Sequence, residues 1–418
     1  MKNLSVWLSA KRAGTLTQDD AGQMAFSYSA DYLQDPNATP LSRRLPLREV
    51  GFSHKVTRSF FAGVLPEEDI RDGVARLLGI SKENDFAMLE RIGGECAGAV
   101  CLLPTDQSPL TFKTAQERRL SGEDLVRVIR ELPGHPLLAG QTGIRLSLAG
   151  AQTKVPLIVK DDDYFLPLND SPSTHILKPE PVRFPGLAAN ETFCMALAKA
   201  VGLRVAEIEY REMDGQRFVL VRRFDREFKN SGELIRLHQE DFCQALGFPP
   251  ERKYQIEGGP NVKDCAKLIW EWSTYPALDL ADFLQRLVFN TLIGNADAHG
   301  KNFSFLYTGS ERRLTPAYDL VSTIAWPGID QGAAMKVGGC DSINTFGIGD
   351  WKKLACQVDA SWPLLSGWMM AIAEGVLEQV DGVATQLATT EKKVVDQLAE
   401  CVKARSIKLL ANMNSTAY

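Results

Sequence analysis

The first hundred residues alternate between short strand patterns and short helical patterns. Apolar and polar residues alternate where strands are expected, and apolar residues recur at helical spacing where helices are expected. Pro66, followed by three acidic residues, favours a helix N-terminus at that point. The predicted elements are strands at 6–8, 24–28 and 98–103 and helices at 66–78 and 85–92. Together they predict an accessory α/β subdomain, residues 1–104.

Strand patterns continue to about residue 225. Residues 105–120 are polar and contain Pro and Thr, which predicts a linker or an exposed loop. Ser121 stands at the N-cap position of a helix, and Asp214-Gly215 is a typical hairpin turn. Further elements are predicted as strands within 144–159 and at 174–178, 207–211 and 218–223, with a helix at 187–201. We therefore expect residues 105–225 to form a β-rich lobe.

Helical periodicity dominates residues 226–418. A hairpin through Gly309-Ser310 interrupts the helical pattern. Helices are predicted at 237–246, 263–272, 278–293, 351–358, 364–376, 381–387 and 392–411. The predicted fold class is α+β, with two lobes: a β-rich N-terminal lobe that carries the accessory subdomain, and a mainly helical C-terminal lobe.

The composition excludes several classes of protein. With 44% hydrophobic and 24% charged residues among 418, the chain can bury ordinary cores. A net charge of −5 gives no overall attraction to nucleic acid, so DNA contact would need a local basic patch or a partner. No apolar run is long enough to span a bilayer, and the N-terminus has the pattern of a strand rather than a signal peptide. Eight scattered cysteines without a Cys/His cluster favour reduced thiols in the cytoplasm.

The candidate chemistry centres on residues 295–305. Asp297 and Asn302 have the Asp-x-x-x-x-Asn spacing of protein-kinase catalytic loops. In that loop the Asp accepts or orients the proton of the attacking hydroxyl, and the Asn holds a metal ion on the phosphates. Asp319 follows after a predicted hairpin, where a kinase places its second metal-binding carboxylate. The spacing alone is also compatible with a helix C-terminal residue followed by a turn residue.

Three upstream features support nucleotide binding only in combination. Small residues and a Lys at 149–154 suit a close approach of the backbone to phosphates, but they fit a plain β-hairpin as well. Lys178 lies on a short strand, where a kinase Lys contacts the α- and β-phosphates and pairs with a Glu on a helix. Glu191 is the candidate partner, although Asn190 and Glu191 also fit an N-cap and a solvated first-turn charge.

Seven ordered motifs together resemble the HipA family, serine/threonine kinases that are the toxins of bacterial type II toxin–antitoxin modules. The resemblance extends over nearly the whole chain and includes residues 98–104. The motifs are Leu146-Ser147-Leu-Ala-Gly-Ala-Gln152-Thr-Lys154, His175-Ile-Leu-Lys178-Pro179, Asn190-Glu191, Arg223-Phe-Asp-Arg226, Gln239-Glu-Asp241, Gly294-Asn-Ala-Asp297-Ala-His299-Gly-Lys-Asn302 and Leu314-Thr-Pro-Ala-Tyr-Asp319.

The resemblance implies a protein-kinase-like fold and an enzyme that uses ATP and Mg²⁺. It implies Asp297 as the catalytic base and Asn302 and Asp319 as the Mg²⁺ ligands. The residues that it implies at the nucleotide are Ala149, Gly150, Ala151, Gln152, Thr153, Lys154, Lys178, Arg222, Arg223, Phe224, His299, Asn302 and Asp319. Ser147 matches the serine whose autophosphorylation silences the kinase; a phosphate there would add nearly two negative charges beside the loop over the ATP phosphates.

The implied partners are a HipB-like antitoxin dimer, operator DNA chiefly through that antitoxin, and glutamyl-tRNA synthetase as the protein substrate. Two other classes compete: a catalytically inactive kinase-fold corepressor, and a small-molecule kinase of the aminoglycoside or choline type, which residues 1–104 disfavour. The chain also departs from eukaryotic kinases, because Leu320-Val321 replaces Phe-Gly after Asp319 and Ala296 replaces the Arg before Asp297. Regulation through that Phe or that Arg is therefore not expected.

Overall fold

The structure, a computed structural model, describes residues 1–110, 114–326, 328–387 and 391–415. The chain folds into two compact units, each assembled from separate stretches. The first unit comprises Met1–Pro179, Arg211–Glu251 and Phe305–Glu311, and the second comprises Glu180–Tyr210, Arg252–Ser304 and Arg312–Tyr418. The predicted boundaries at residues 104 and 225 stay predictions.

The first unit begins with a four-stranded antiparallel sheet in the order β3-β2-β1-β4. Its elements are β1 Lys2–Leu8, β2 Lys11–Gln18, β3 Met24–Tyr28, α1 Ala30–Gln34, α2 His54–Phe61, α3 Glu68–Leu78, α4 Asp85–Ile92 and β4 Val100–Leu103. Phe26, Phe60 and Phe86 are fully buried in the core that joins sheet and helices. The sequence patterns missed β2, α1 and α2. Gly14 lies within β2, where a Cβ would stand 2.1 Å from the Ser27 carbonyl oxygen.

A six-stranded sheet follows, in the order β5-β7-β6-β8-β10-β9. Its strands are β5 Gln116–Leu120, β6 Val155–Lys160, β7 Asp163–Leu168, β8 His175–Pro179, β9 Ile208–Met213 and β10 Gln216–Arg222. Helix α5, Gly122–Glu131, begins at a capping box on Ser121 and buries Leu125 and Ile129 against the sheet. The predicted loop at 105–120 is wrong at its end, because residues 116–120 form edge strand β5. Its polar side chains are typical of an exposed sheet edge.

The remaining short elements of this region are two hairpins, a strand and a helix. They are β11 Arg226–Phe228, β12 Leu234–Arg236, β13 His238–Asp241, α7 Phe242–Leu246, β14 Ser304–Thr308 and β15 Glu311–Leu314. The predicted hairpin through Gly309-Ser310 is confirmed by β14 and β15. The predicted helix at 237–246 is partly wrong. It begins only at Phe242, since Asp241 caps it with Gln244, and the residues before it form β13.

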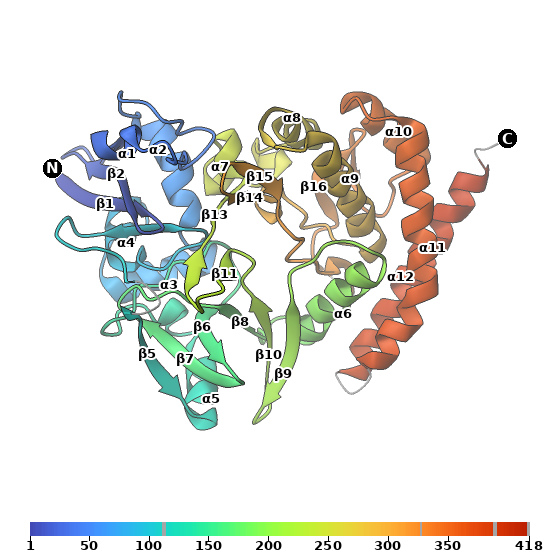
Figure 1. Cartoon of the computed structure of the whole chain (residues 1–418). Coiled ribbons are helices and arrows are strands. Elements are labelled where there is room, and N and C mark those ends of the chain that lie inside the picture. The colour runs from blue at the N-terminus through green and yellow to red at the C-terminus, as the bar shows by residue number, and fades with distance from the viewer. Residues whose placement is uncertain (111–113, 327, 388–390, 416–418) are drawn as a thin grey trace. The chain divides into compact units, whose positions relative to one another are not determined.

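The second unit is mainly helical. It contains α6 Leu187–Ala200, α8 Val262–Trp272, α9 Pro276–Ile293, α10 Ile348–Gln357, α11 Trp362–Gln386 and α12 Lys392–Ser415, with the small β-ladder of β16 Gly332–Val337 and β17 Cys340–Ser342. Helices α11 and α12 run side by side and pack on α6 and α9 (Figure 1). The predicted break between 376 and 381 is wrong: α11 is continuous, because Val376, Val380 and Val383 keep one face of the helix buried across it.

Two expectations about the whole chain can be compared with this structure. All eight cysteines are unpaired thiols, and five of them are buried. Among the described residues, no helix is both long enough and apolar enough to cross a membrane.

Candidate active site

The predicted catalytic loop directly follows helix α9, which ends at a glycine. Gly294 adopts φ 71°, the left-handed conformation of a helix C-cap. A Cβ at this position would lie 2.3 Å from Cδ1 of Ile324, so the close approach also requires glycine. The chain therefore leaves α9 at a fixed angle, three residues before Asp297.

Neutral side chains hold the backbone between Gly294 and Asp297. Asn295 donates from Nδ2 to Oδ1 of Asn290 at 2.8 Å, and its own Oδ1 accepts from the backbone N–H of Asp297 at 3.0 Å. Thr323 Oγ1 accepts from the N–H of Ala296 at 2.9 Å and donates to the carbonyl of Gly294 at 3.1 Å. These bonds fix the main chain at Asp297, whose side chain is exposed.

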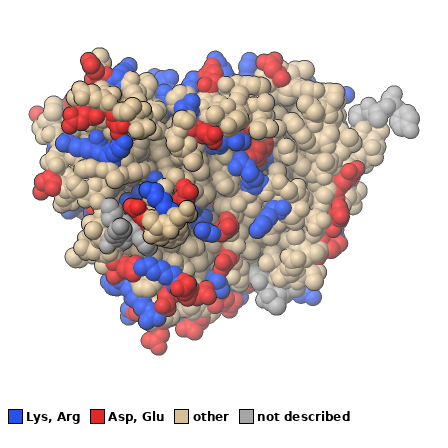
Figure 2. Space-filling model, viewed as in Figure 1, with Lys and Arg blue, Asp and Glu red and all other residues tan. Residues whose placement is uncertain are grey.

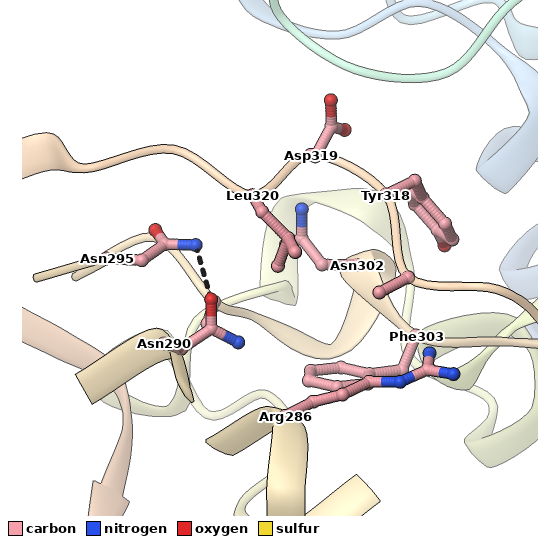
Figure 3. A pocket seen from close by; sticks show the side chains of 10 residues that line it. Arg286, Asn290, Asn295, Asn302, Phe303, Tyr318, Asp319 and Leu320 are labelled. Carbon is pink, nitrogen blue, oxygen red and sulfur yellow. Dashed lines mark hydrogen bonds between the residues drawn. The ribbon is translucent and has the colours of Figure 1, made fainter. Parts of the chain in front are cut away.

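Asn302 and Asp319 line one small pocket within the second unit. In Figure 3 both side chains point the same way, away from Arg286 and Phe303 at the other side of the pocket. Oδ1 of Asn302 accepts from the backbone N–H of His299 at 3.1 Å, which orients the amide. The structure thus brings Asn302 and Asp319 together and places Asp297 in the same loop as Asn302.

The backbone at Asp319 is strained, and α6 holds the segment that follows it. Asp319 has φ 53°, a conformation that non-glycine residues adopt where their surroundings impose it. Asn190 donates from Nδ2 to the carbonyl of Ser322 at 3.0 Å, and its Oδ1 accepts from the Ser322 N–H at 2.8 Å. The N-cap interpretation of Asn190 is wrong because Gly186 caps α6. The solvated interpretation of Glu191 is wrong too, because it is 2% exposed.

The donor set fits magnesium. Among the described residues, no group of three or more His, Cys, Asp and Glu side chains could hold a metal by itself. Mg²⁺ does not require such a group, because it is usually bound by one or two protein oxygens together with substrate phosphates and water. The Asp319 carboxylate and the second lone pair of the Asn302 amide oxygen are oxygen donors of that kind.

Among the predicted nucleotide residues of the first unit, the 149–154 loop leads into β6 and Lys178 lies on β8. Val155 pairs with Leu177, so Lys154 lies beside Lys178 at the end of the β6–β8 ladder. Lys154 donates from Nζ to the Ala149 carbonyl at 2.7 Å, which closes the 149–154 loop on itself. The hairpin interpretation of this loop is wrong, because residues 144–148 do not pair with β6.

Arg222, Arg223 and Phe224, which the resemblance implies at the nucleotide, lie at the other end of these strands. Arg222 pairs with His175 and its side chain is exposed, whereas Arg223 is 4% exposed. The Arg223 guanidinium donates to Asp225 and Glu95, so any contact of Arg223 with a nucleotide would come from its main chain. Phe224 is half-buried.

Ser147 is completely buried. Its Oγ donates to the carbonyl of Val64 at 2.8 Å, and its N–H donates to the carbonyl of Glu95 at 2.9 Å. Leu146 forms an isolated parallel bridge with Glu95, and Gly150 forms another with Pro66. Residues of the predicted accessory subdomain (1–104) therefore hold the Ser147 segment on both sides, at Leu146 and at Gly150, through main-chain bonds.

Glu95, which no sequence pattern indicated, organises a cluster of buried charges. Its carboxylate accepts from Arg223 at 3.0 Å, Arg226 at 2.7 Å and Arg236 at 2.8 Å, and it is completely buried. Burial alone would raise the pKa of Glu95, but the charges of these arginines hold it well below the usual value. The Arg-Phe-Asp-Arg motif was visible in the sequence, but its partner lies about 130 residues away.

Tyr254 is a second residue that no sequence pattern indicated. Its hydroxyl donates to Oδ1 of Asp297 at 2.7 Å, and its ring packs edge-on against His299. It lies 43 residues before Asp297 in a short polar stretch without periodicity. Only the folded chain brings the two together.

Comparison with known proteins supplies the family. Residues 4–103 match the family model of the HipA N-terminal domain, and residues 146–387 match that of the HipA-like C-terminal domain. The chain is 45% identical over 380 residues to the putative kinase Y4mE of Sinorhizobium fredii, which covers 90% of both chains. It is 34% identical over 346 residues to the serine/threonine-protein kinase toxin HipA of Shewanella oneidensis, covering 80% of this chain and 78% of that one.

A solved structure agrees with these matches. The fold is similar to a chain in the complex of Shewanella oneidensis HipA, HipB and operator DNA, with a TM-score of 0.86, 28% identity, and coverage of 99% of this chain and 98% of that one. The class is that of mixed α/β proteins with a two-lobed, kinase-like fold, as expected. The chain belongs to the HipA family, as the ordered motifs predicted.

Proposed function

We propose that this protein is an ATP-dependent serine/threonine-protein kinase that acts as the toxin of a toxin–antitoxin pair. Asp297 accepts the proton of a serine or threonine hydroxyl while the hydroxyl oxygen attacks the γ-phosphorus of ATP. The bond from the γ-phosphorus to the bridging oxygen of the β-phosphate breaks, and ADP leaves with that oxygen. Lys178, with the 149–154 loop, neutralises and positions the phosphates.

One observation carries the proposal. Asn302 and Asp319, 17 positions apart in the sequence, line one pocket next to the loop that presents Asp297. Mg²⁺ bound to Asn302 and Asp319 would neutralise negative charge on the phosphates during transfer. Hydrogen bonds from Asn190, Asn295 and Thr323 hold both sides of this pocket, and such preorganisation is what phosphoryl transfer requires.

Asp297→Asn tests the proposal. Because the amide cannot accept the proton, we expect phosphate incorporation to fall about 10²- to 10⁴-fold while ATP affinity changes less than about twofold. Intact mass after incubation with Mg-ATP measures the product, and the matched control Asp20→Asn, at an exposed turn, should behave as wild type. Wild-type speed in Asp297→Asn would contradict the assignment.

Autophosphorylation at Ser147 is the proposed form of self-inactivation. Ser147 is fully buried and bonded to Val64, so it accepts phosphate only after residues 146–150 leave this position. A phosphate carries nearly two charges and cannot return to a site without water, since burying an unpaired charge is costly. The displaced segment would take the phosphate-binding loop with it.

The proposed partners are a HipB-like antitoxin and, through it, operator DNA. Support comes from the similarity to the HipA chain that was solved with HipB and operator DNA. In the face seen in Figure 2, Lys and Arg side chains are interspersed with Asp and Glu, which agrees with the net charge of −5. Glutamyl-tRNA synthetase is proposed as the substrate on the family resemblance alone.

An inactive corepressor is the second candidate function. The same relative supports it, because complex formation with an antitoxin needs no catalysis. Intact mass separates the two candidates: a gain of one phosphate with Mg-ATP supports the kinase. An unchanged mass, together with antitoxin binding, supports the corepressor.

A further inference from the structure

Tyr254 contacts the proposed base from outside the catalytic loop. Its hydroxyl lies 2.7 Å from Oδ1 of Asp297, a distance typical of a hydroxyl that donates to a carboxylate. Among the described residues, Tyr254 is the one side chain that donates a hydrogen bond to this carboxylate. The Asp297 side chain is exposed, so without this bond it would be free to rotate into solvent.

The chain around Tyr254 is built to hold it in place. Its carbonyl accepts from the N–H groups of Glu257 at 3.1 Å and Gly259 at 2.9 Å. A Cβ at position 259 would stand 2.3 Å from the Arg252 carbonyl oxygen, so this tight turn requires the glycine. Edge-on contact with the His299 ring, with centroids 5.2 Å apart, fixes the aromatic ring as well.

Strand β16 connects the Tyr254 turn to the catalytic loop. The N–H of Ala334 donates to the carbonyl of Ala296 at 2.8 Å, and the N–H of Lys336 donates to Oε1 of Gln255 at 2.8 Å. Ala296, next to Asp297, and Gln255, next to Tyr254, therefore accept hydrogen bonds from the same strand, at positions 334 and 336. The hydrogen bond from Tyr254 to Asp297 is thus supported on both sides by bonds from the main chain of β16.

We propose that Tyr254 is a positioning residue for Asp297, an inference that rests on the proposed kinase function. The bond to Oδ1 holds the carboxylate in one orientation and leaves Oδ2 to accept the proton of the serine or threonine hydroxyl. The tyrosine neither gains nor loses a proton in the reaction. It acts on the chemical step through Asp297, and it has no part in holding ATP.

Tyr254→Phe removes the hydroxyl but keeps the ring against His299. We expect the single-turnover rate constant for phosphate incorporation at saturating Mg-ATP to fall about tenfold. The ATP concentration that gives half the maximal rate and the melting temperature should stay unchanged. Tyr254→Leu, which also loses the ring contact, should lower the rate at least as much. Tyr275→Phe, in the same unit and beside Arg313, is the matched control and should behave as wild type.

A double-mutant cycle shows whether Tyr254 acts through Asp297. In the Asp297→Asn background, adding Tyr254→Phe should leave the residual rate unchanged. A wild-type rate in Tyr254→Phe, or the same tenfold loss in both backgrounds, would overturn the inference and leave the kinase proposal standing. Full activity of Asp297→Asn, or a wild-type protein that incorporates no phosphate, would overturn both.

Discussion

The segments around Ser147 and Asp297 are held by different kinds of bonds. Around Asp297, neutral amides and hydroxyls that lie mostly within about thirty residues fix the backbone. Around Ser147, its hydroxyl donates to the Val64 carbonyl and its N–H donates to the Glu95 carbonyl, and Glu95 is itself held by three buried arginines. The Ser147 segment is therefore held by residues far earlier in the chain, about 50 positions for Glu95 and about 80 for Val64, whereas most bonds to the backbone around Asp297 come from nearby residues.

Glu95→Ala is the strongest test of this difference. It would leave Arg223, Arg226 and Arg236 buried without their shared carboxylate, so we expect the free energy of unfolding to fall by about 3–5 kcal/mol. Urea denaturation measures it. Glu117→Gln, which disrupts the more exposed pair with Lys160, should cost about 0–1 kcal/mol. Equal losses of unfolding free energy in the two variants would mean that the buried cluster stabilises the fold no more than an exposed ion pair does.

Glu240 provides a contrast within the first unit, because its buried carboxylate is bonded to hydroxyls and a main-chain group: Ser42, Tyr307 and the backbone N–H of Arg43. Burial raises the pKa of Glu240 to about 7, and burial lowers the pKa of His238, on the same strand, to about 4. The folded state then keeps a proton on Glu240 that the unfolded state releases above pH 4.5. This contribution to stability is complete below pH 4.5 and is lost as the pH rises to about 7.

Glu240→Gln should remove the loss of stability that wild type shows as the pH rises from 4.5 to about 7. The free energy of unfolding of the variant, relative to wild type, should rise between pH 4.5 and 7 by at most about 3 kcal/mol. The opposite contribution of His238, which is lost as the pH falls from 6.5 to about 4, should remain in both proteins. Urea denaturation across this pH range measures the difference, and parallel pH profiles would contradict the assignment to Glu240.

Asn190→Ala tests whether the bonds from Asn190 to the Ser322 backbone hold the segment that follows Asp319. The change leaves the buried N–H and C=O of Ser322 without their partner, so we expect a loss of about 1–3 kcal/mol. Phosphate incorporation should also fall, because the segment after Asp319 is released. Asn37→Ala, on the surface, serves as the control. A variant that loses stability but keeps full activity would separate these bonds from catalysis.

Ser147→Ala should have the smallest effect. It removes one buried hydrogen bond to Val64, which corresponds to about 1 kcal/mol of unfolding free energy. Ser147→Asp should destabilise the segment more, since it places a charge at a fully buried site. Limited proteolysis of residues 146–154 measures the release, with Ser310→Ala as an exposed control. Equal protection in Ser147→Asp and wild type would contradict a displaceable segment.

Local patterns predicted a large part of the fold. The capped helix after Ser121, the helix at 85–92, the Asp214-Gly215 hairpin and most of the C-terminal helices follow from residue spacing and turn chemistry. Errors arose where packing overrides a local signal. Residues 116–120 form an edge strand of the six-stranded sheet although they are polar, and α11 continues past residue 376 because its buried face packs on neighbouring helices.

The sequence by itself determined the order and spacing of Asp297, Asn302 and Asp319 and the family to which the chain belongs, because these depend on short motifs. Only the tertiary structure decided that Glu95 holds the segment of Ser147, that Asn190 clamps the chain after Asp319, and that Tyr254 reaches Asp297. The physical reason is that a hydrogen bond between residues 40 to 130 positions apart leaves no periodic trace in the sequence. It becomes visible when the backbone brings donor and acceptor within 3 Å.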